Sequence, residues 1–486
     1  MMNKKNRIVL IACLAVILVL AVVLAIAGRT TEKPDDTTPD IGETNPTEKL
    51  PSAEKAQKVF ASLESEKDIS KLEVYKKDDL KYTVVFNAAI DGFLLQGYEH
   101  MLYNENFSKV ITAAHTLEIK EEIADPISDE EYGVSPVSAE YTVMLTDKNG
   151  KQQMLYVGSE LISGAGYYCK LSDDERVFCV NNSVKKLFSD NNSLLSTQLQ
   201  NPLDSSKYHY TENFKLYKDL LPFVEVRFVP ESERESGNAY GYYQMVYPGE
   251  YIPSDANYDA ALKSLICPMA DSIVTTEITP ENIEKYGFAK PSYEVEYTLD
   301  GKTNKLYFGN RTGDGMIYVM SDYGFIGLAV VAERFPFLDY ELVDFINPYL
   351  FGMNINYISR VALSGQGFSD RYSLSGKDEA LVVTDEKSGK TIDTQNFRNY
   401  YRDLLMLEMK GYAASAKEEN WKFTFNIETI GGKIYEFKFY HTSERECYYT
   451  VNGKGEFYVD ISDVEKLVSD ARKLAAGEKV DPEAEF

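Results

Sequence analysis

Short runs that alternate between apolar and polar residues recur through most of the chain after residue 51. The run 293–299 is followed by an Asp300-Gly301 turn and the run 305–309, and the same succession occurs at 141–158. Tight glycine turns between consecutive runs indicate antiparallel strands, and the alternation indicates one buried and one solvated face. The pattern therefore predicts antiparallel meanders of three or four strands.

A segment with apolar residues at helical spacing precedes each meander. The stripes are Phe107, Val110, Ile111 and Ala114; Tyr258, Ala261, Leu262, Leu265, Ile266 and Met269; and Phe397, Tyr400, Tyr401, Leu404 and Leu405. Such spacing places one apolar face of a helix against a sheet. Ser254 or Asp255 can cap the second helix, and Asp393 or Thr394 the third.

Two strands are predicted before each helix. They are 69–75 with 82–86, 224–229 with 242–246, and 358–363 with 380–383. The repeated unit is thus strands, one amphipathic helix, and a meander. The predicted fold class is α+β, with three tandem modules after an N-terminal transmembrane helix.

The three modules are predicted to span 52–205, 206–350 and 351–477, with an acidic tail at 478–486. The stretch 131–136, with its Tyr-Gly entry to the meander, recurs at 285–291. The third module lacks this Tyr-Gly signature. We therefore interpret the third module as a degenerate copy.

The N-terminus carries the clearest targeting signal. Lys4, Lys5 and Arg7 precede an uninterrupted apolar run over 8–27. As a helix this run is ~30 Å long, which matches the hydrocarbon thickness of a bilayer. The basic residues before it orient the N-terminus inward, so a cytoplasmic stub at 1–7 and an extracytoplasmic chain at 28–486 are predicted. The prediction is a single-pass cell-membrane protein with a signal anchor.

Two alternatives remain open for this segment. Residues 25–27, Ala-Ile-Ala, have the form of a signal-peptidase site, and residues 10–13, Leu-Ile-Ala-Cys, resemble a lipoprotein cleavage box. The residues after the apolar run, 28–51, are rich in Pro, Thr and acids and lack apolar periodicity, which is typical of a solvated linker.

Charge narrows the range of partners. Asp and Glu number 76 against 51 Lys and Arg, which gives a formal net charge of −25. Binding to nucleic acid needs a basic face, so nucleic acid is not a predicted partner. The lipid bilayer is the predicted partner of residues 8–27.

Little in the sequence points to catalysis. The chain has only four His and five Cys, with no spacing suited to zinc and no nucleophile motif. We therefore predict no enzyme activity, no cofactor and no metal site. Cys169 and Cys179 flank a turn-like segment, and either form a disulfide or pack as small apolar residues.

The meander motifs resemble those of the domain of unknown function 4340 (DUF4340) family of membrane-anchored bacterial envelope proteins. The stretches 132–180 and 286–331 carry the Tyr-Gly entry, the strand ending in Leu-Tyr-x-Gly, and the Tyr strand that follows; 421–459 departs from this pattern. The resemblance implies one membrane anchor, α+β modules outside the cytoplasm, and an accessory role beside ABC-type export systems. An ABC-type transporter permease or another envelope protein is the implied partner, and no catalytic residue carries over.

One segment departs from the repeat. Residues 237–251 form an insertion in the second module that contains Tyr240, Tyr242, Tyr243, Tyr247 and Tyr251. Tyrosine with glycine is a composition typical of binding surfaces. The predicted function is a non-catalytic accessory or scaffold of an envelope export system. The alternative is a surface module that binds a glycan or peptide through this insertion, and the rings could instead simply pack on the sheet.

Overall fold

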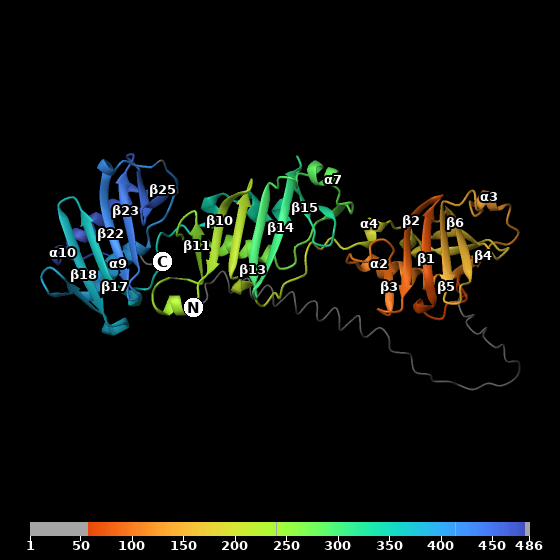
Figure 1. The fold of residues 1–486 in the computed structure, drawn as a ribbon, viewed down its shortest axis with the longest axis horizontal. Helices are drawn as coiled ribbons and strands as arrows, with labels where there is room; N and C mark the ends of the chain where they lie inside the picture. The colour runs from red at the N-terminus through yellow and green to blue at the C-terminus, as the bar shows by residue number, and fades with distance from the viewer. Residues whose placement is uncertain (1–56, 240, 414, 482–486) are drawn as a thin grey trace, which may run out of the picture. The chain divides into compact units, whose positions relative to one another are not determined.

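The structure is a computed structural model that describes residues 57–239, 241–413 and 415–481 (Figure 1). Three antiparallel sheets of eight, eight and nine strands follow one another along the chain, accompanied by helices. The predicted α+β class is confirmed. The predicted stub, membrane helix and linker, and most of the acidic tail, lie outside the described residues. Among the described helices, none is both long and apolar enough to cross a membrane.

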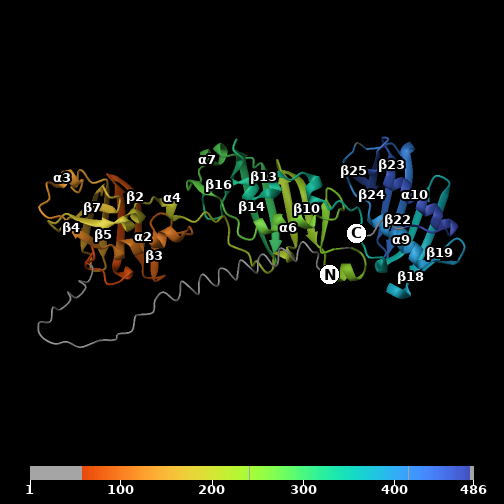
Figure 2. The same cartoon turned by 180° about the vertical axis from the view of Figure 1, so that it is seen from behind.

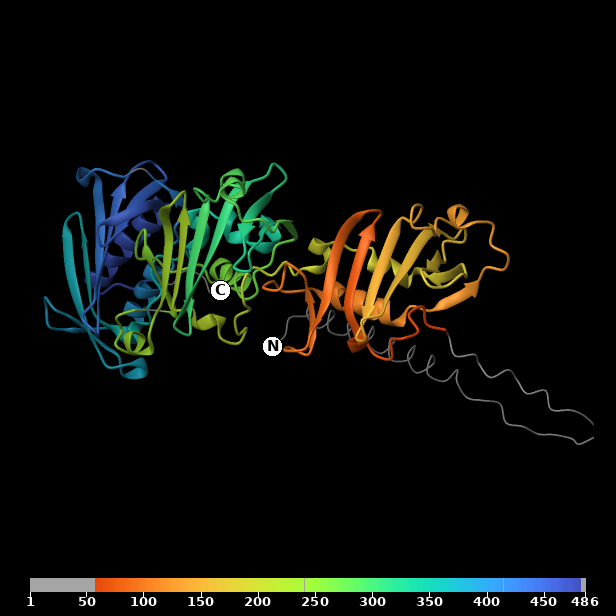
Figure 3. The same ribbon diagram turned by 45° about the vertical axis from the view of Figure 1, so that its right-hand side comes forward.

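The first sheet has the strand order β3-β2-β1-β5-β6-β7-β8-β4, and Figure 3 shows its strands side by side. Its elements are β1 (Ile69–Lys76), β2 (Asp79–Asn87), β3 (Gly92–Leu95), α2 (Glu105–Thr116), β4 (Ile119–Glu122), α3 (Asp129–Tyr132), β5 (Tyr141–Asp147), β6 (Gln152–Glu160), β7 (Gly166–Leu171) and β8 (Phe178–Asn181), preceded by the 3₁₀ turn η1 (Glu66–Asp68) and followed by the 3₁₀ turn η2 (Asn182–Leu187) and α4 (Asn191–Leu194).

The second sheet repeats this order as β11-β10-β9-β13-β14-β15-β16-β12. Its elements are η3 (Tyr208–Tyr210), β9 (Asn213–Lys218), β10 (Leu221–Phe228), α5 (Glu231–Glu235), β11 (Tyr243–Tyr247), α6 (Asp255–Ser264), β12 (Ser272–Thr275), α7 (Pro280–Lys285), β13 (Tyr293–Leu299), β14 (Lys302–Arg311), β15 (Met316–Met320) and β16 (Ile326–Val330), followed by α8 (Val331–Arg334), η4 (Pro336–Asp339) and η5 (Leu342–Phe345).

The third sheet has the same order with one added edge strand, β20-β19-β18-β17-β22-β23-β24-β25-β21. Its elements are η6 (Ile355–Tyr357), β17 (Ile358–Gly365), β18 (Phe368–Ser375), η7 (Asp378–Ala380), β19 (Val382–Asp385), β20 (Thr391–Ile392), α9 (Thr394–Leu405), β21 (Gly411–Tyr412), η8 (Glu418–Asn420), β22 (Trp421–Thr429), β23 (Ile434–His441), β24 (Glu446–Val451), β25 (Lys454–Asp460) and α10 (Ile461–Ala476). The three sheets lie within 69–181, 213–330 and 358–460, and we refer to them with their helices as the first, second and third modules.

One amphipathic helix of each module packs its apolar stripe on the sheet. Figure 2 shows α6 in front of the second sheet, and α9 and α10 in front of the third. The stripe residues Phe107, Tyr258 and Phe397 are buried. The side chains of Ser254 and Asp393 cap α6 and α9 by accepting hydrogen bonds from backbone N–H groups of the first turn, as predicted.

The second helix is shorter than its apolar stripe predicts. α6 ends at Ser264, and the N–H of Leu265 bonds the carbonyl of Leu262, which is the tighter hydrogen bonding of a final turn. Ile266 and Met269 lie beyond the helix. Pro268 explains the early end, because proline offers no N–H and restricts the residue before it to extended conformations.

Each module has three strands before its helix rather than the two predicted. The additional strands are β3, β9 and β18, and the third module adds β20. A further short strand follows each helix, and β4, β12 and β21 pair at the far edge with β8, β16 and β25. The two halves of each sheet join through the first strand, as in the pairing of β9 with β13.

The Tyr-Gly signature has a structural role. An added Cβ at Gly309 in β14 would lie 2.0 Å from the carbonyl oxygen of Tyr286, so only glycine allows this approach. Gly287 has φ +88°, a left-handed conformation that favours glycine. The Tyr286 ring lies 4.7 Å from that of Tyr318 in β15. The first module repeats these contacts with Tyr132, Gly133, Gly158 and Tyr168.

Candidate binding pocket

The five tyrosines of the insertion take different positions. Tyr240 lies outside the described residues. Tyr242 is 61% exposed, and the Arg234 guanidinium lies 4.3 Å from its ring centroid. Tyr243 begins β11, and its hydroxyl donates a hydrogen bond to the backbone carbonyl of His209.

The other two tyrosines lie apart from this pair. Tyr247 ends β11 and is exposed. Tyr251 is buried, and its ring lies 5.5 Å from that of Phe457 in the third module. Next to it, Glu250 forms an ion pair with Lys433 at 3.0 Å. Tyr251 therefore serves a contact within the chain, whereas Tyr242 and Tyr243 meet at a cavity.

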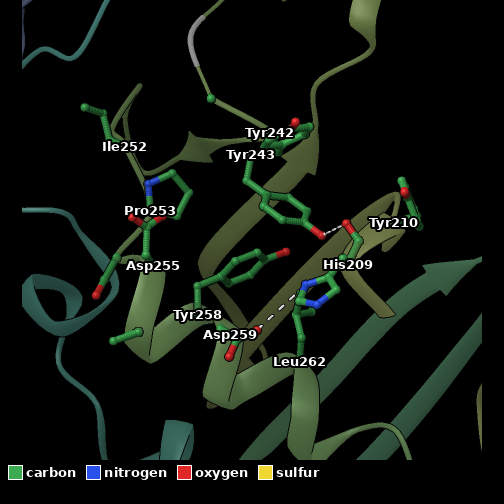
Figure 4. A pocket seen from close by; sticks show the side chains of 13 residues that line it. His209, Tyr210, Tyr242, Tyr243, Ile252, Pro253, Asp255, Tyr258, Asp259 and Leu262 are labelled. Atoms are coloured by element: carbon green, nitrogen blue, oxygen red, sulfur yellow. Dashed lines mark hydrogen bonds and ion pairs between the residues drawn. The ribbon is translucent and has the colours of Figure 1, made fainter. Parts of the chain in front are cut away.

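This cavity, the tyrosine pocket, has a volume of about 750 Å³ and lies within the second module (Figure 4). The turn η3, the start of β11 and the first turns of α6 surround it. Its lining comprises His209, Tyr210, Gly241, Tyr242, Tyr243, Ile252, Pro253, Ser254, Asp255, Ala256, Tyr258, Asp259 and Leu262. Two predicted residues line it, Tyr242 and Tyr243; Tyr247 and Tyr251 do not.

One end of the tyrosine pocket is polar. Asp259 accepts a hydrogen bond from the Tyr208 hydroxyl at 2.9 Å and forms an ion pair with Lys263 at 2.6 Å. Burial raises the pKa of Asp259, but these hydrogen bonds outweigh burial, so the pKa lies below its ordinary value. The His209 Nδ1 atom is 3.9 Å from the same carboxylate. This carboxylate is charged at neutral pH and is largely balanced by Lys263.

The inner wall is aromatic. The rings of Tyr243 and Tyr258 stand edge to face with centroids 4.9 Å apart, and Tyr258 packs in the same way on Phe214 at 5.6 Å. Burial raises the pKa of both phenols, so both are neutral hydrogen-bonding groups at physiological pH. Ile252, Pro253 and Leu262 supply aliphatic walls. The arrangement is suited to an apolar group that carries a polar atom.

Sequence patterns alone did not identify several pocket residues. Tyr258 was predicted as a core residue of the helix stripe, and His209, Tyr210 and Asp259 were not singled out. The cluster Tyr208-His209-Tyr210, placed directly before a strand, was an available signal. A cavity, however, depends on which turn, strand and helix meet, and spacing does not encode that.

The two cysteines of the first module are free thiols in the structure. Both are buried on neighbouring strands, where Cys169 pairs with Phe178 and Cys179 pairs with Tyr168. Directly paired residues share a face and neighbours along a strand alternate, so the two thiols point to opposite faces of the sheet. This register explains why they are not joined. Within the described residues, no group of three or more His, Cys, Asp or Glu side chains could hold a metal ion.

The structure thus defines a tandem of three α+β modules of one strand order, with a tyrosine-lined pocket in the second. The family model described as Domain of unknown function (DUF4340) matches residues 252–422. The chain carries a DUF4340 domain, and the predicted resemblance is confirmed. The match begins just before α6 and ends at the start of β22, so it covers parts of the second and third modules. No curated protein and no solved structure matches the chain.

Proposed function

We propose that this chain is a non-catalytic binding protein of the cell envelope, and that the tyrosine pocket receives a peptide or glycan group presented by a partner. The pocket itself carries the proposal. Its volume of about 750 Å³ is in the range of ligand sites, roughly 300–1,000 Å³. Tyr210 and Tyr242, at 60% and 61% exposure, offer rings that a partner can cover.

Binding can be measured on the full-length chain held in lipid nanodiscs, because detergent would compete for an apolar pocket. The probes are N-acetyl-L-phenylalanine amide for a peptide and N,N′-diacetylchitobiose for a glycan, titrated by saturation-transfer NMR. We expect one probe to bind, and the Tyr210→Ala/Tyr242→Ala double variant to lose that binding. Tyr247→Ala is the matched control, because Tyr247 is exposed in the same insertion but does not line the pocket. Unchanged binding by the double variant would contradict the proposal.

The proposed location is the outer side of the cell membrane, with residues 8–27 as a single-pass anchor. The apolar run and the basic residues before it support this topology. Cys267 provides a test, because it is an exposed free thiol whereas Cys169, Cys179 and Cys447 are buried. A membrane-impermeant maleimide applied to intact cells should label the chain, and Cys267→Ser should abolish labelling. Labelling only after lysis would place the modules inside.

A second candidate is an accessory or scaffold role in an ABC-type export system. Three modules of one strand order offer repeated surfaces on a single chain, and the resemblance to the DUF4340 family implies such a setting. If this role is correct, a transporter permease encoded beside this chain should co-purify with it. Deletion of residues 1–28 should remove the complex while leaving the modules folded. Unchanged export in cells that lack the chain would count against this role.

A further inference from the structure

Tyr258 occupies a helix position that the other two modules fill with phenylalanine. The stripes of α2, α6 and α9 begin with Phe107, Tyr258 and Phe397, each followed by apolar residues at the same spacing. All three side chains are buried. The second module therefore differs from the first and third modules at this position by one hydroxyl group.

That hydroxyl is not explained by the packing of the module. Tyr258 is 3% exposed, and its hydroxyl has no hydrogen-bond partner among the described residues. The neighbouring Tyr243 hydroxyl is already donated to the His209 carbonyl. A buried, unpartnered polar group destabilises a fold, whereas phenylalanine would keep the ring contacts. The Tyr400 hydroxyl in α9 is equally unpartnered within the described part of the chain, but Tyr258 lines the tyrosine pocket, so a bound ligand can supply the partner that its hydroxyl lacks.

The hydroxyl lies where the tyrosine pocket is polar. Figure 4 shows the polar ends of Tyr258 and Tyr243 directed toward His209, while Ile252 and Pro253 lie on the other side of the pocket. A ligand that fills the pocket would thus place its polar atom near Tyr258 and its apolar body along the aliphatic wall. The Tyr243 ring stands edge to face on Tyr258, so it must shift for direct contact.

We propose that Tyr258 is the specificity-determining residue of the tyrosine pocket, and that its hydroxyl donates a hydrogen bond to an amide carbonyl beside an apolar peptide side chain. This rests on the proposed binding function and adds the ligand class. A sugar ring carries several hydroxyls that each need a partner once buried. The walls formed by Ile252, Pro253 and Leu262 offer none, whereas an apolar side chain with one adjoining carbonyl suits them.

The test compares Tyr258→Phe with the unaltered full-length chain in nanodiscs, using N-acetyl-L-phenylalanine amide as the probe. We expect the dissociation constant to rise about tenfold, the effect of losing one hydrogen bond. Tyr400→Phe is the matched control, because Tyr400 in α9 also has a buried hydroxyl without a partner among the described residues, yet lies outside the pocket. It should leave the dissociation constant unchanged.

Each result has one interpretation. If the unaltered chain binds the amide and Tyr258→Phe binds it equally well, the role of Tyr258 is wrong while the binding function stands. If only diacetylchitobiose binds, the pocket is a binding site but the peptide assignment is overturned. If neither probe binds, the proposed function fails and this inference with it. A thermal midpoint of Tyr258→Phe at or above that of the unaltered chain would show that a loss of affinity does not reflect misfolding.

Discussion

The first two modules and the third reach the same strand order by different local contacts. In the second module, Tyr293 pairs with Phe308, and the next residue is Gly309, which the Tyr286 turn approaches closely. In the third module, Phe423 pairs with Phe439, and the next residue is Tyr440. A side chain thus stands where the first two modules require none.

The contact made by the signature tyrosine nevertheless persists in the third module. Tyr440 lies 6.0 Å from Tyr448, as Tyr286 lies 4.7 Å from Tyr318. The hydroxyl of Tyr440 donates to Glu418 of η8 at 3.0 Å. In the third module, β23 therefore supplies the tyrosine ring that the turn after α7 supplies in the second module. A degenerate sequence signature does not mean a degenerate fold, because the tyrosine contact can be rebuilt from another position.

The third module also has an ion cluster between two helices. Lys466 of α10 lies 2.5 Å from Asp403 of α9 and 3.1 Å from Asp470, and both carboxylates are buried. Lys473 also pairs with Asp470, at 2.7 Å. In the other modules, short segments such as η2 and η4 follow the last strand in place of the long helix α10.

The largest effect should follow from Tyr440→Ala. The change removes a buried ring and its hydrogen bond, so we expect a loss of about 4 kcal/mol in the stability of the third module. Hydrogen exchange of peptides from β23 and β24 would report it. Tyr440→Phe, which keeps the ring, should lose only about 1 kcal/mol. Equal losses would show that the ring does not replace the Tyr-Gly signature.

Lys466→Met tests the ion cluster. Removal of this charge leaves Asp403 and Asp470 buried with less compensation, so we expect the third module to lose about 3 kcal/mol. Faster hydrogen exchange in α9 and α10 would measure the loss. Lys422→Met is the control, because its partner Glu465 is exposed and such a pair contributes about 0.5 kcal/mol. Similar effects of the two changes would contradict a role specific to the buried cluster.

Gly309→Ala tests the glycine approach in the second module. The new Cβ would meet the Tyr286 carbonyl at 2.0 Å, so the turn must move, at about 2 kcal/mol. Peptides from β14 and α7 should exchange faster. Gly313→Ala in the same module has no atom within 4 Å of the added Cβ and should have little effect. If Gly309→Ala were equally harmless, the Tyr-Gly signature would not be a packing requirement.

The smallest effect concerns acid sensitivity. Before β1, the Asp68 carboxylate accepts hydrogen bonds from Lys148 Nζ at 2.7 Å and the Ser65 N–H at 2.9 Å, and these lower its pKa from 3.8 to about 2. Before β17, the third module has Tyr357 instead. A pKa lower in the folded state stabilises the first module above about pH 4, and this stabilisation is lost as the pH falls from about 4 to about 2.

Asp68→Asn should therefore weaken the first module at neutral pH and not at pH 2. Hydrogen exchange of β1 peptides across this range would show the two chains converging as the pH falls, with the third module unaffected by the substitution. A difference that stayed constant down to pH 2 would show that the Asp68 charge is not responsible.

Much of the fold followed from local patterns. The alternation over 293–299, the turn at Asp300-Gly301 and the cap at Ser254 are encoded by neighbouring residues. β18 was missed because its sequence, FSDRYSLS, is largely polar. β9 was missed although its buried Phe214 and Leu216 alternate with less buried residues. Burial of β18 on one face depends on β17 and β19 beside it, which local pattern does not reveal.

The tyrosine pocket was only partly predictable. The composition of the insertion drew attention to Tyr242 and Tyr243, but Tyr251 has the same composition around it and instead packs on Phe457. The sequence pattern placed Tyr258 among ordinary core residues, because tyrosine and phenylalanine both count as apolar positions in a helix stripe. Its hydroxyl became notable only when its surroundings were known.

The sequence by itself determined the repeated α+β unit, the helix caps, the glycine turns and the resemblance to the DUF4340 domain. These depend on periodicity and on residues close along the chain. Only the tertiary structure decided the pairing of β1 with β5 and the meeting of His209, Tyr243 and Tyr258 at one pocket. It also placed Tyr440 of the third module at the strand position that Gly309 occupies in the second. Those contacts join residues far apart in sequence, and their energies depend on close packing and hydrogen-bond geometry that exist only once the sheets have formed.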